Sequence, residues 1–163
     1  NLCFTASRRF VHERLGWNYR MTNLQAAVGV AQLERLPETL AIKRKMGAQY
    51  QEQLQGVGSL QLPVDKTDYA ENHYWVFGIV LDESLGLSAR EFAKKLGSEG
   101  IGTRPFFYPM HLQPVLQRMG LFAGQRYPIA ERLYEYGLYV PSGVAITESQ
   151  VDRVCSVVRR LAR

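Results

Sequence analysis

One four-residue pattern occurs three times in the chain and sets the start of three helices. A Thr or Ser is followed three residues later by Gln or Glu at Thr22–Gln25, Ser88–Glu91 and Thr147–Gln150, each time just before residues with helical apolar spacing. In this capping box, the first side chain bonds the backbone of the third helical residue, whose own side chain bonds back. We therefore expect helices that begin near residues 23, 89 and 148, with the other elements fitted between them.

The segment Tyr74–Leu81 is the strongest strand candidate, because aromatic and β-branched residues dominate it. Weaker extended segments are expected at 60–63, 100–109 and 137–141, and further helices at 38–55, 112–120 and 128–136. This order of elements predicts an α+β fold with a small antiparallel or mixed sheet of three to four strands covered by helices. In the helix at 38–55, the basic run Lys43–Lys45 is expected on a solvated edge.

The helix expected over 24–36 has a face of small and apolar residues, among them Leu24, Ala27, Val28 and Leu33. Small side chains let another helix or backbone approach closely, so this helix is expected to pack inside a larger body. Left uncovered, such a face favours non-native association.

The composition is that of an ordinary globular chain. Of 163 residues, 46% are hydrophobic and 21% are charged, and the length suits one domain or one domain with an arm. The net charge of +5 suits an anionic partner, but it equally suits a solvated basic surface. Neither a run long enough for a membrane span nor a signal-peptide pattern occurs, so no membrane association is expected.

The two cysteines, Cys3 and Cys155, lie near opposite ends of the chain. Because they form no CxxC pair, neither a zinc site nor a disulfide framework is expected, and a cytoplasmic location is the simpler interpretation. The histidines His12, His73 and His111 share no metal-ligand spacing. We therefore expect no metal site.

The stretch Gly16–Arg20 concentrates groups that could bind a ligand. It places an amide, a phenol and a guanidinium directly before a helix start, a combination that suits anions such as phosphate. The residue types leave an alternative open, in which the stretch is a surface loop capped by Asn18 with its aromatic residues packed below.

A second such stretch is Gly102–Pro114, which sets Arg104, Tyr108 and His111 among prolines and aromatic residues. Extended backbone, stacking faces and hydrogen-bond donors could together hold a nucleotide or a sugar. Here the open alternative is an ordered connection in which a backbone carbonyl satisfies His111.

Both stretches belong to longer motifs. Residues 16–34 read GWNYRMTNLQAAVGVAQLE and resemble the G-[YWF]-N-Y-[RK]-[ML]-[TS]-x-[LIM]-x-A-A-x-G-x-x-Q-L segment of the DegT/DnrJ/StrS sugar aminotransferases. Residues 100–113 resemble the later G-I-x-[TS]-R…Y-x-P-x-H-x-Q segment, and residues 138–158 resemble the closing strand and helix of that family. Order and spacing match over nearly the whole chain.

The resemblance implies a fold-type I enzyme that depends on pyridoxal phosphate (PLP). Such enzymes transfer an amino group, usually from glutamate, to a keto sugar nucleotide, and they work as homodimers. Their Schiff-base lysine precedes the Asn-Tyr-Arg motif, and none of the five lysines here matches a family lysine motif. The chain is therefore expected to be the C-terminal part of such an enzyme and inactive alone. The Thr103–His111 motif is most similar to perosamine synthases, which implies a GDP-linked 4-keto-6-deoxy sugar and lipopolysaccharide O-antigen synthesis.

The resemblance also assigns roles to individual residues. Asn18 matches the residue that reaches the PLP phosphate of the other subunit, and Arg20 matches a basic residue of the same shared site. Tyr19, Arg104, Tyr108 and His111 match substrate-binding positions, whereas no catalytic residue is expected in this chain. Residues 1–36 are expected to be an arm and helix of the large-domain and dimer interface, and residues 37–163 the C-terminal small domain.

Two other functions compete with this interpretation. One is a stand-alone α+β module that binds a nucleotide or acts in regulation without catalysis. The other is a nucleic-acid binder that uses the basic N-terminal arm, but the chain has no basic-aromatic sheet motif of the RNA-binding type, so no nucleic-acid partner is expected.

Overall fold

The computed structural model describes residue 17 and residues 19–163. The sequence predictions for Asn18 and for the basic N-terminal arm lie outside these residues. The chain divides into two compact units, Asn1–Leu36 and Pro37–Arg163. Of the described helices, none is both long enough and apolar enough to cross a membrane.

The first unit contains helix α1 (Asn23–Glu34). Its start is the predicted capping box, in which Thr22 Oγ1 accepts from the Gln25 backbone N–H and the Gln25 side chain accepts from the Thr22 backbone N–H. No residue of α1 is buried, and the apolar side chains of Leu24 and Val28 are 82% and 64% exposed.

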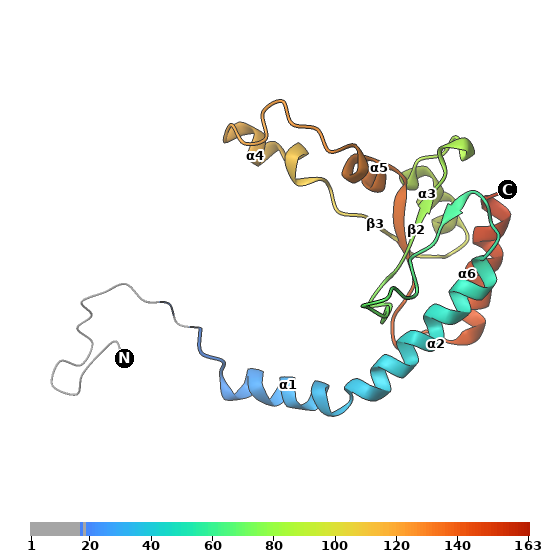
Figure 1. Ribbon diagram of the computed structural model, residues 1–163. Coiled ribbons are helices and arrows are strands. Elements are labelled where there is room, and N and C mark those ends of the chain that lie inside the picture. Colours follow the sequence, from blue (N-terminus) through green and yellow to red (C-terminus); the bar gives the residue numbers. More distant parts are fainter. Residues whose placement is uncertain (1–16, 18) are drawn as a thin grey trace. The chain divides into compact units, whose positions relative to one another are not determined.

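The second unit is built on a four-stranded antiparallel sheet, which confirms the predicted α+β class (Figure 1). In spatial order its strands are β1 (Leu60–Gln61), β2 (Phe77–Leu81), β4 (Gly137–Val140) and β3 (Arg104–Pro105). The central pair aligns Phe77 with Val140 and Val80 with Gly137. Strand β3 is an edge strand that pairs Arg104 with Tyr139.

Three helices supply most of the core of this unit: α2 (Leu36–Leu54), α3 (Ala89–Ser98) and α6 (Glu148–Leu161). Their buried side chains pack with those of β2 and β4 in one cluster, which includes Met46, Tyr50, Leu54, Phe77, Ile79, Leu81, Phe92, Leu96, Leu138, Val151, Val154 and Val158. The predicted capping boxes of α3 and α6 are both present.

A long excursion, residues 106–136, connects strand β3 to strand β4. After β3 it contains the short 3-10 helix η3 (Met110–Leu112) and α4 (Pro114–Arg118), and it returns through α5 (Pro128–Tyr136) into β4. A further 3-10 helix, η2 (Glu83–Leu85), follows β2. The ring of Phe106 lies so close to Gly78 and Gly137 that a Cβ at either position would fall within 3.0 Å of its carbon atoms.

Two sequence expectations are wrong in instructive ways. The strand predicted over Tyr74–Leu81 begins only at Phe77, because Tyr74 has a φ of 51° and its backbone N–H donates to Asn72 Oδ1. This turn buries the Tyr74 ring, stacked on Phe77. Lys43, expected on a solvated edge, is only 7% exposed.

Candidate functional site

A cavity of about 730 Å³ lies beside the edge strand β3. Arg104 lines it together with Tyr139 and with the segment Pro141–Gly143 that follows β4. Within the described residues, the Arg104 side chain makes no hydrogen bond and no ion pair, whereas its backbone belongs to the β3–β4 ladder. Its guanidinium is thus available to an anionic ligand, for which its planar set of donors is well suited.

Buried polar groups hold the wall of this cavity in place. Lys43 Nζ, on α2, donates to the backbone carbonyls of Trp75 and Ser142. Tyr50 Oη donates to the carbonyl of Pro141 at 2.7 Å. Burial lowers the pKa of the Lys43 ammonium and raises the pKa of the Tyr50 phenol. Through these hydrogen bonds, both side chains fix the segment after β4 on the core.

Tyr108 lies further along the excursion and is exposed. Its ring meets that of Tyr134, on α5, edge to face with centroids 4.9 Å apart. Tyr108 is thus 39% exposed while an aromatic contact fixes the position of its ring.

His111 is buried, with 5% of its surface exposed. Its Nε2 lies 3.0 Å from Glu131 Oε1, so a carboxylate satisfies this side chain rather than the backbone carbonyl of the open alternative. Glu131 also accepts from Arg126 Nη2 and from the Tyr127 backbone N–H. The hydrogen bonds from Arg126, His111 and Tyr127 lower the pKa of Glu131 to about 2. This cluster ties the excursion to α5.

The other predicted site residues belong to the first unit. Trp17 and Tyr19 are 76% and 88% exposed, and their ring centroids lie 6.4 Å apart. Arg20 is exposed as well. Aromatic rings and a guanidinium thus precede the capped start of α1.

The five lysines differ in their surroundings. The ammonium of Lys43 is engaged by two carbonyls, and Lys45 pairs with Glu148 on the surface. Lys66, Lys94 and Lys95 are exposed.

The structure gathers the site residues only in part. Arg104, Tyr108 and His111 lie on one excursion, but each has its own surroundings: a cavity, an aromatic contact and a carboxylate. Sequence reasoning missed Lys43, which lies in a basic run, and Glu131, which lies beside Arg132, because charged helix residues of this kind are mostly solvated. A partial signal existed for Lys43, since it falls three residues before Met46 on the buried side of α2.

Comparisons with known proteins match most of the length of this chain. Residues 3–159 match the sequence model of the DegT/DnrJ/EryC1/StrS aminotransferase family. A GDP-perosamine synthase of Caulobacter vibrioides is 34% identical over 152 residues, which cover 93% of this chain and 40% of that protein.

Two further similar proteins extend the comparison. A Bacillus subtilis protein that carries the provisional name of pyridoxal phosphate-dependent aminotransferase EpsN is 30% identical over 153 residues, or 93% of this chain and 39% of that protein. The crystal structure of DesI in the presence of its TDP-sugar product superposes with a TM-score of 0.72 at 28% identity, covering 87% of this chain and 36% of DesI. The chain thus spans about 40% of the length of the curated relatives it matches.

Proposed function

The chain belongs to the DegT/DnrJ/EryC1/StrS aminotransferase family, and on this basis we propose that it forms the C-terminal portion of an enzyme that moves an amino group from glutamate to a keto sugar nucleotide with PLP. The observation that carries the proposal is Arg104, a guanidinium without a protein partner among the described residues, at a cavity of about 730 Å³. A diphosphate is the part of a sugar nucleotide that such a group recognises.

The groups beside Arg104 support a role for this cavity in substrate binding. The ring of Tyr139 lines it, and the backbone of the segment after β4 is held by Lys43 and Tyr50. Binding sites of this kind combine apolar or aromatic walls with a few fixed polar groups. Tyr108 does not line this cavity, but it offers an exposed aromatic residue on the same excursion for the base or the sugar.

His111 supports this site indirectly, because it holds the segment around Tyr108 in position. Its Nε2 is engaged by Glu131 and its surface is almost fully covered, so its effect on substrate passes through the excursion that carries Tyr108. We therefore assign His111 as a positioning residue of the substrate-binding segment.

Asn18 and Arg20 fit the phosphate of PLP by their chemistry, since an amide and a guanidinium both donate hydrogen bonds to phosphate oxygens. The exposure of Arg20 leaves it accessible to such a ligand. The lysines do not fit covalent attachment, so this chain contributes binding groups only. When bound, PLP supplies an electron sink beside the carbon that gains or loses the amino group.

The first unit has the properties of an interface element. The apolar side chains of Leu24, Val28 and Leu33 on α1 are between 64% and 82% exposed, far more than a core helix allows. We assign residues 1–36 to the contact with a large domain or a second subunit in a homodimer, where Tyr19 reaches the substrate. A cytoplasmic location fits the unpaired Cys155 thiol.

A nucleotide-binding experiment tests the proposal. In the complete protein, Arg104→Gln should weaken GDP binding by about tenfold or more, since it removes a charged donor pair from the diphosphate. Arg118→Gln, on the exposed surface of α4, is the matched control and should bind like the wild type. Equal affinities of wild type and R104Q in isothermal titration calorimetry would remove Arg104 from the site. GDP binding without any amino transfer would instead favour the regulatory module.

A further inference from the structure

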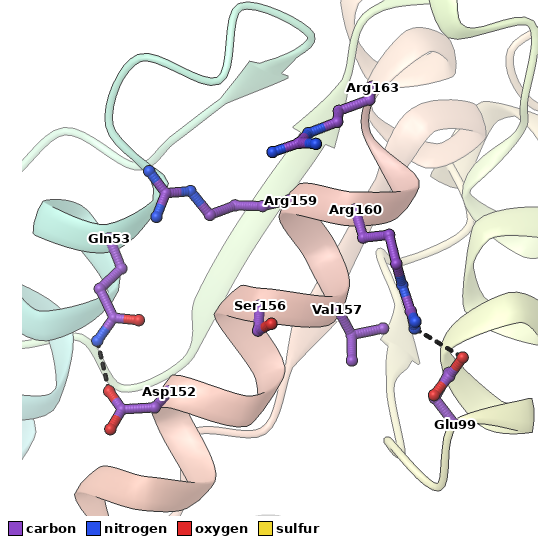
Figure 2. A pocket seen from close by; sticks show the side chains of 8 residues that line it. All are labelled: Gln53, Glu99, Asp152, Ser156, Val157, Arg159, Arg160 and Arg163. Atoms are coloured by element: carbon purple, nitrogen blue, oxygen red, sulfur yellow. Dashed lines mark hydrogen bonds and ion pairs between the residues drawn. The ribbon is translucent and has the colours of Figure 1, made fainter.

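A second basic surface lies on α6 and shares no lining residue with the cavity at Arg104. It surrounds a hollow of about 560 Å³ between the end of α6, the last turns of α2 and the end of α3 (Figure 2). Ser156, Arg159, Arg160 and Arg163 line it from the α6 side.

The two carboxylates at this hollow are already engaged. Asp152 Oδ1 accepts from the Gln53 amide at 2.6 Å and from the Gln49 amide at 2.8 Å. Glu99 Oε1 pairs with Arg160 Nη2 at 2.7 Å. The guanidinium groups of Arg159 and Arg163, by contrast, make no hydrogen bond and no ion pair within the described part of the chain.

The free donors share one side of the helix. Ser156, Arg159 and Arg163 follow each other at intervals of three and four residues, which is the spacing of neighbours on one helical face. Figure 2 shows the guanidinium groups of Arg159 and Arg163 extending to the same side, whereas Arg160 turns toward Glu99. Two like charges one turn apart repel each other, and an anion between them removes that repulsion.

Basic residues near the end of a helix also interact favourably with its dipole. In α6 the dipole accounts for basic residues near the helix end, but it does not account for the shared orientation of Arg159 and Arg163. The Ala162 carbonyl at the end of α6 accepts from Ser59 Oγ, and neither Arg159 nor Arg163 donates to a terminal carbonyl, as a cationic cap would.

We propose that this hollow binds a phosphate or diphosphate group of a small molecule, with Arg159 and Arg163 as paired donors and the Ser156 hydroxyl as a third. Arginine forks match phosphate oxygens with two parallel hydrogen bonds each, and the hydroxyl lies on the same face. The site is separate from the proposed substrate cavity and does not depend on the aminotransferase assignment.

The test follows backbone amide signals of Ser156 and Val157 by NMR during titration with inorganic pyrophosphate, a readout specific to this helix. Saturable shifts are expected in the wild type. Arg159→Gln with Arg163→Gln should weaken pyrophosphate binding by about tenfold or more. The double variant R90Q/R118Q removes the same charge from α3 and α4 and should leave the affinity within about twofold. Replacement of both arginines by lysine keeps the charge and the fold, and should give an intermediate affinity.

Inorganic phosphate and GDP, titrated in the same way, distinguish a single phosphate from a nucleotide diphosphate as the preferred ligand. No saturation by about 10 mM pyrophosphate, which corresponds to less than about 3 kcal/mol of binding, would overturn the proposal. So would an equal loss of affinity in R90Q/R118Q. A lower melting temperature of the R159Q/R163Q variant with unchanged pyrophosphate shifts would assign the arginines to the helix dipole alone.

Discussion

Helices α1 and α6 begin with the same capping box but differ in how much of their surface is buried. Each opens on a Thr whose hydroxyl accepts from the backbone of a Gln three residues on. Yet α6 buries five residues against the sheet, and α1 buries none. Local hydrogen bonding thus sets where a helix starts, whereas the contacts of its apolar face decide what the helix contributes to stability.

Removing the same methyl groups from both helices should give the largest contrast. Val158 is fully buried and Val28 is 64% exposed. Val158→Ala should lower the free energy of unfolding by about 2 kcal/mol, because it removes buried apolar volume and leaves a cavity. Val28→Ala should change it by less than about 0.5 kcal/mol. Urea denaturation of this chain measures both values.

The same pair of variants also tests the interface assigned to α1. In the complete protein, Val28→Ala should become destabilising, because a large domain or second subunit then covers the helix. An effect of Val28→Ala that stays below about 0.5 kcal/mol in the complete protein would speak against that interface.

Two lysines within one turn of α2 should differ almost as much. Lys43→Met leaves the carbonyls of Trp75 and Ser142 without their donor and should cost about 1–3 kcal/mol. Lys45→Met removes only an exposed pair with Glu148 and should leave the free energy of unfolding almost unchanged. Equal unfolding midpoints for the two variants would show that the Lys43 contacts do not stabilise the fold.

The capping boxes themselves offer a smaller contrast. Thr147→Ala should lower the free energy of unfolding by about 1 kcal/mol, since α6 is part of the core. Thr22→Ala should leave the global transition unchanged and only speed amide hydrogen exchange in the first turn of α1. A global loss from Thr22→Ala as large as that from Thr147→Ala would mean that α1 is coupled to the core.

The smallest effect is expected from the cluster at His111, and it depends on pH. Hydrogen bonds to Glu131 lower its pKa from 4.5 to about 2 in the folded chain. A depressed carboxyl pKa stabilises the fold above the unfolded value, so this contribution is complete above pH 4.5 and is lost as the pH falls toward 2. Glu131→Gln should therefore flatten the acid side of the stability profile. Parallel profiles for wild type and variant in urea melts between these pH values would contradict this.

Much of the fold could be predicted from local signals. The capping boxes of α1, α3 and α6, the proline at the start of α5 and the apolar run in β2 each depend on residues close together in the sequence. Those predictions are confirmed. The exception at Tyr74 arises because its left-handed backbone and its hydrogen bond to the Asn72 side chain delay the start of the strand to Phe77, and residue types do not reveal that geometry.

The candidate site was less predictable, because its supporting groups come from distant segments. Lys43 and Ser142 are 99 residues apart in the chain, and His111 and Glu131 are 20 apart. A charged residue on a helix looks the same in the sequence whether it points to solvent or to a buried carbonyl. Arg104 was found only through the motif that surrounds it, and its role stays a prediction.

Glutamate-dependent amination of a GDP-linked 4-keto-6-deoxy sugar by the complete protein tests the central claim most directly. The claim predicts an aminated sugar nucleotide and 2-oxoglutarate in equal amounts, with Arg104→Gln raising KM for the sugar nucleotide by about tenfold or more while Arg118→Gln leaves it unchanged. Residues 1–163 alone should give no product. Turnover by this chain alone, or a complete protein that binds the sugar nucleotide without releasing 2-oxoglutarate, would contradict the account.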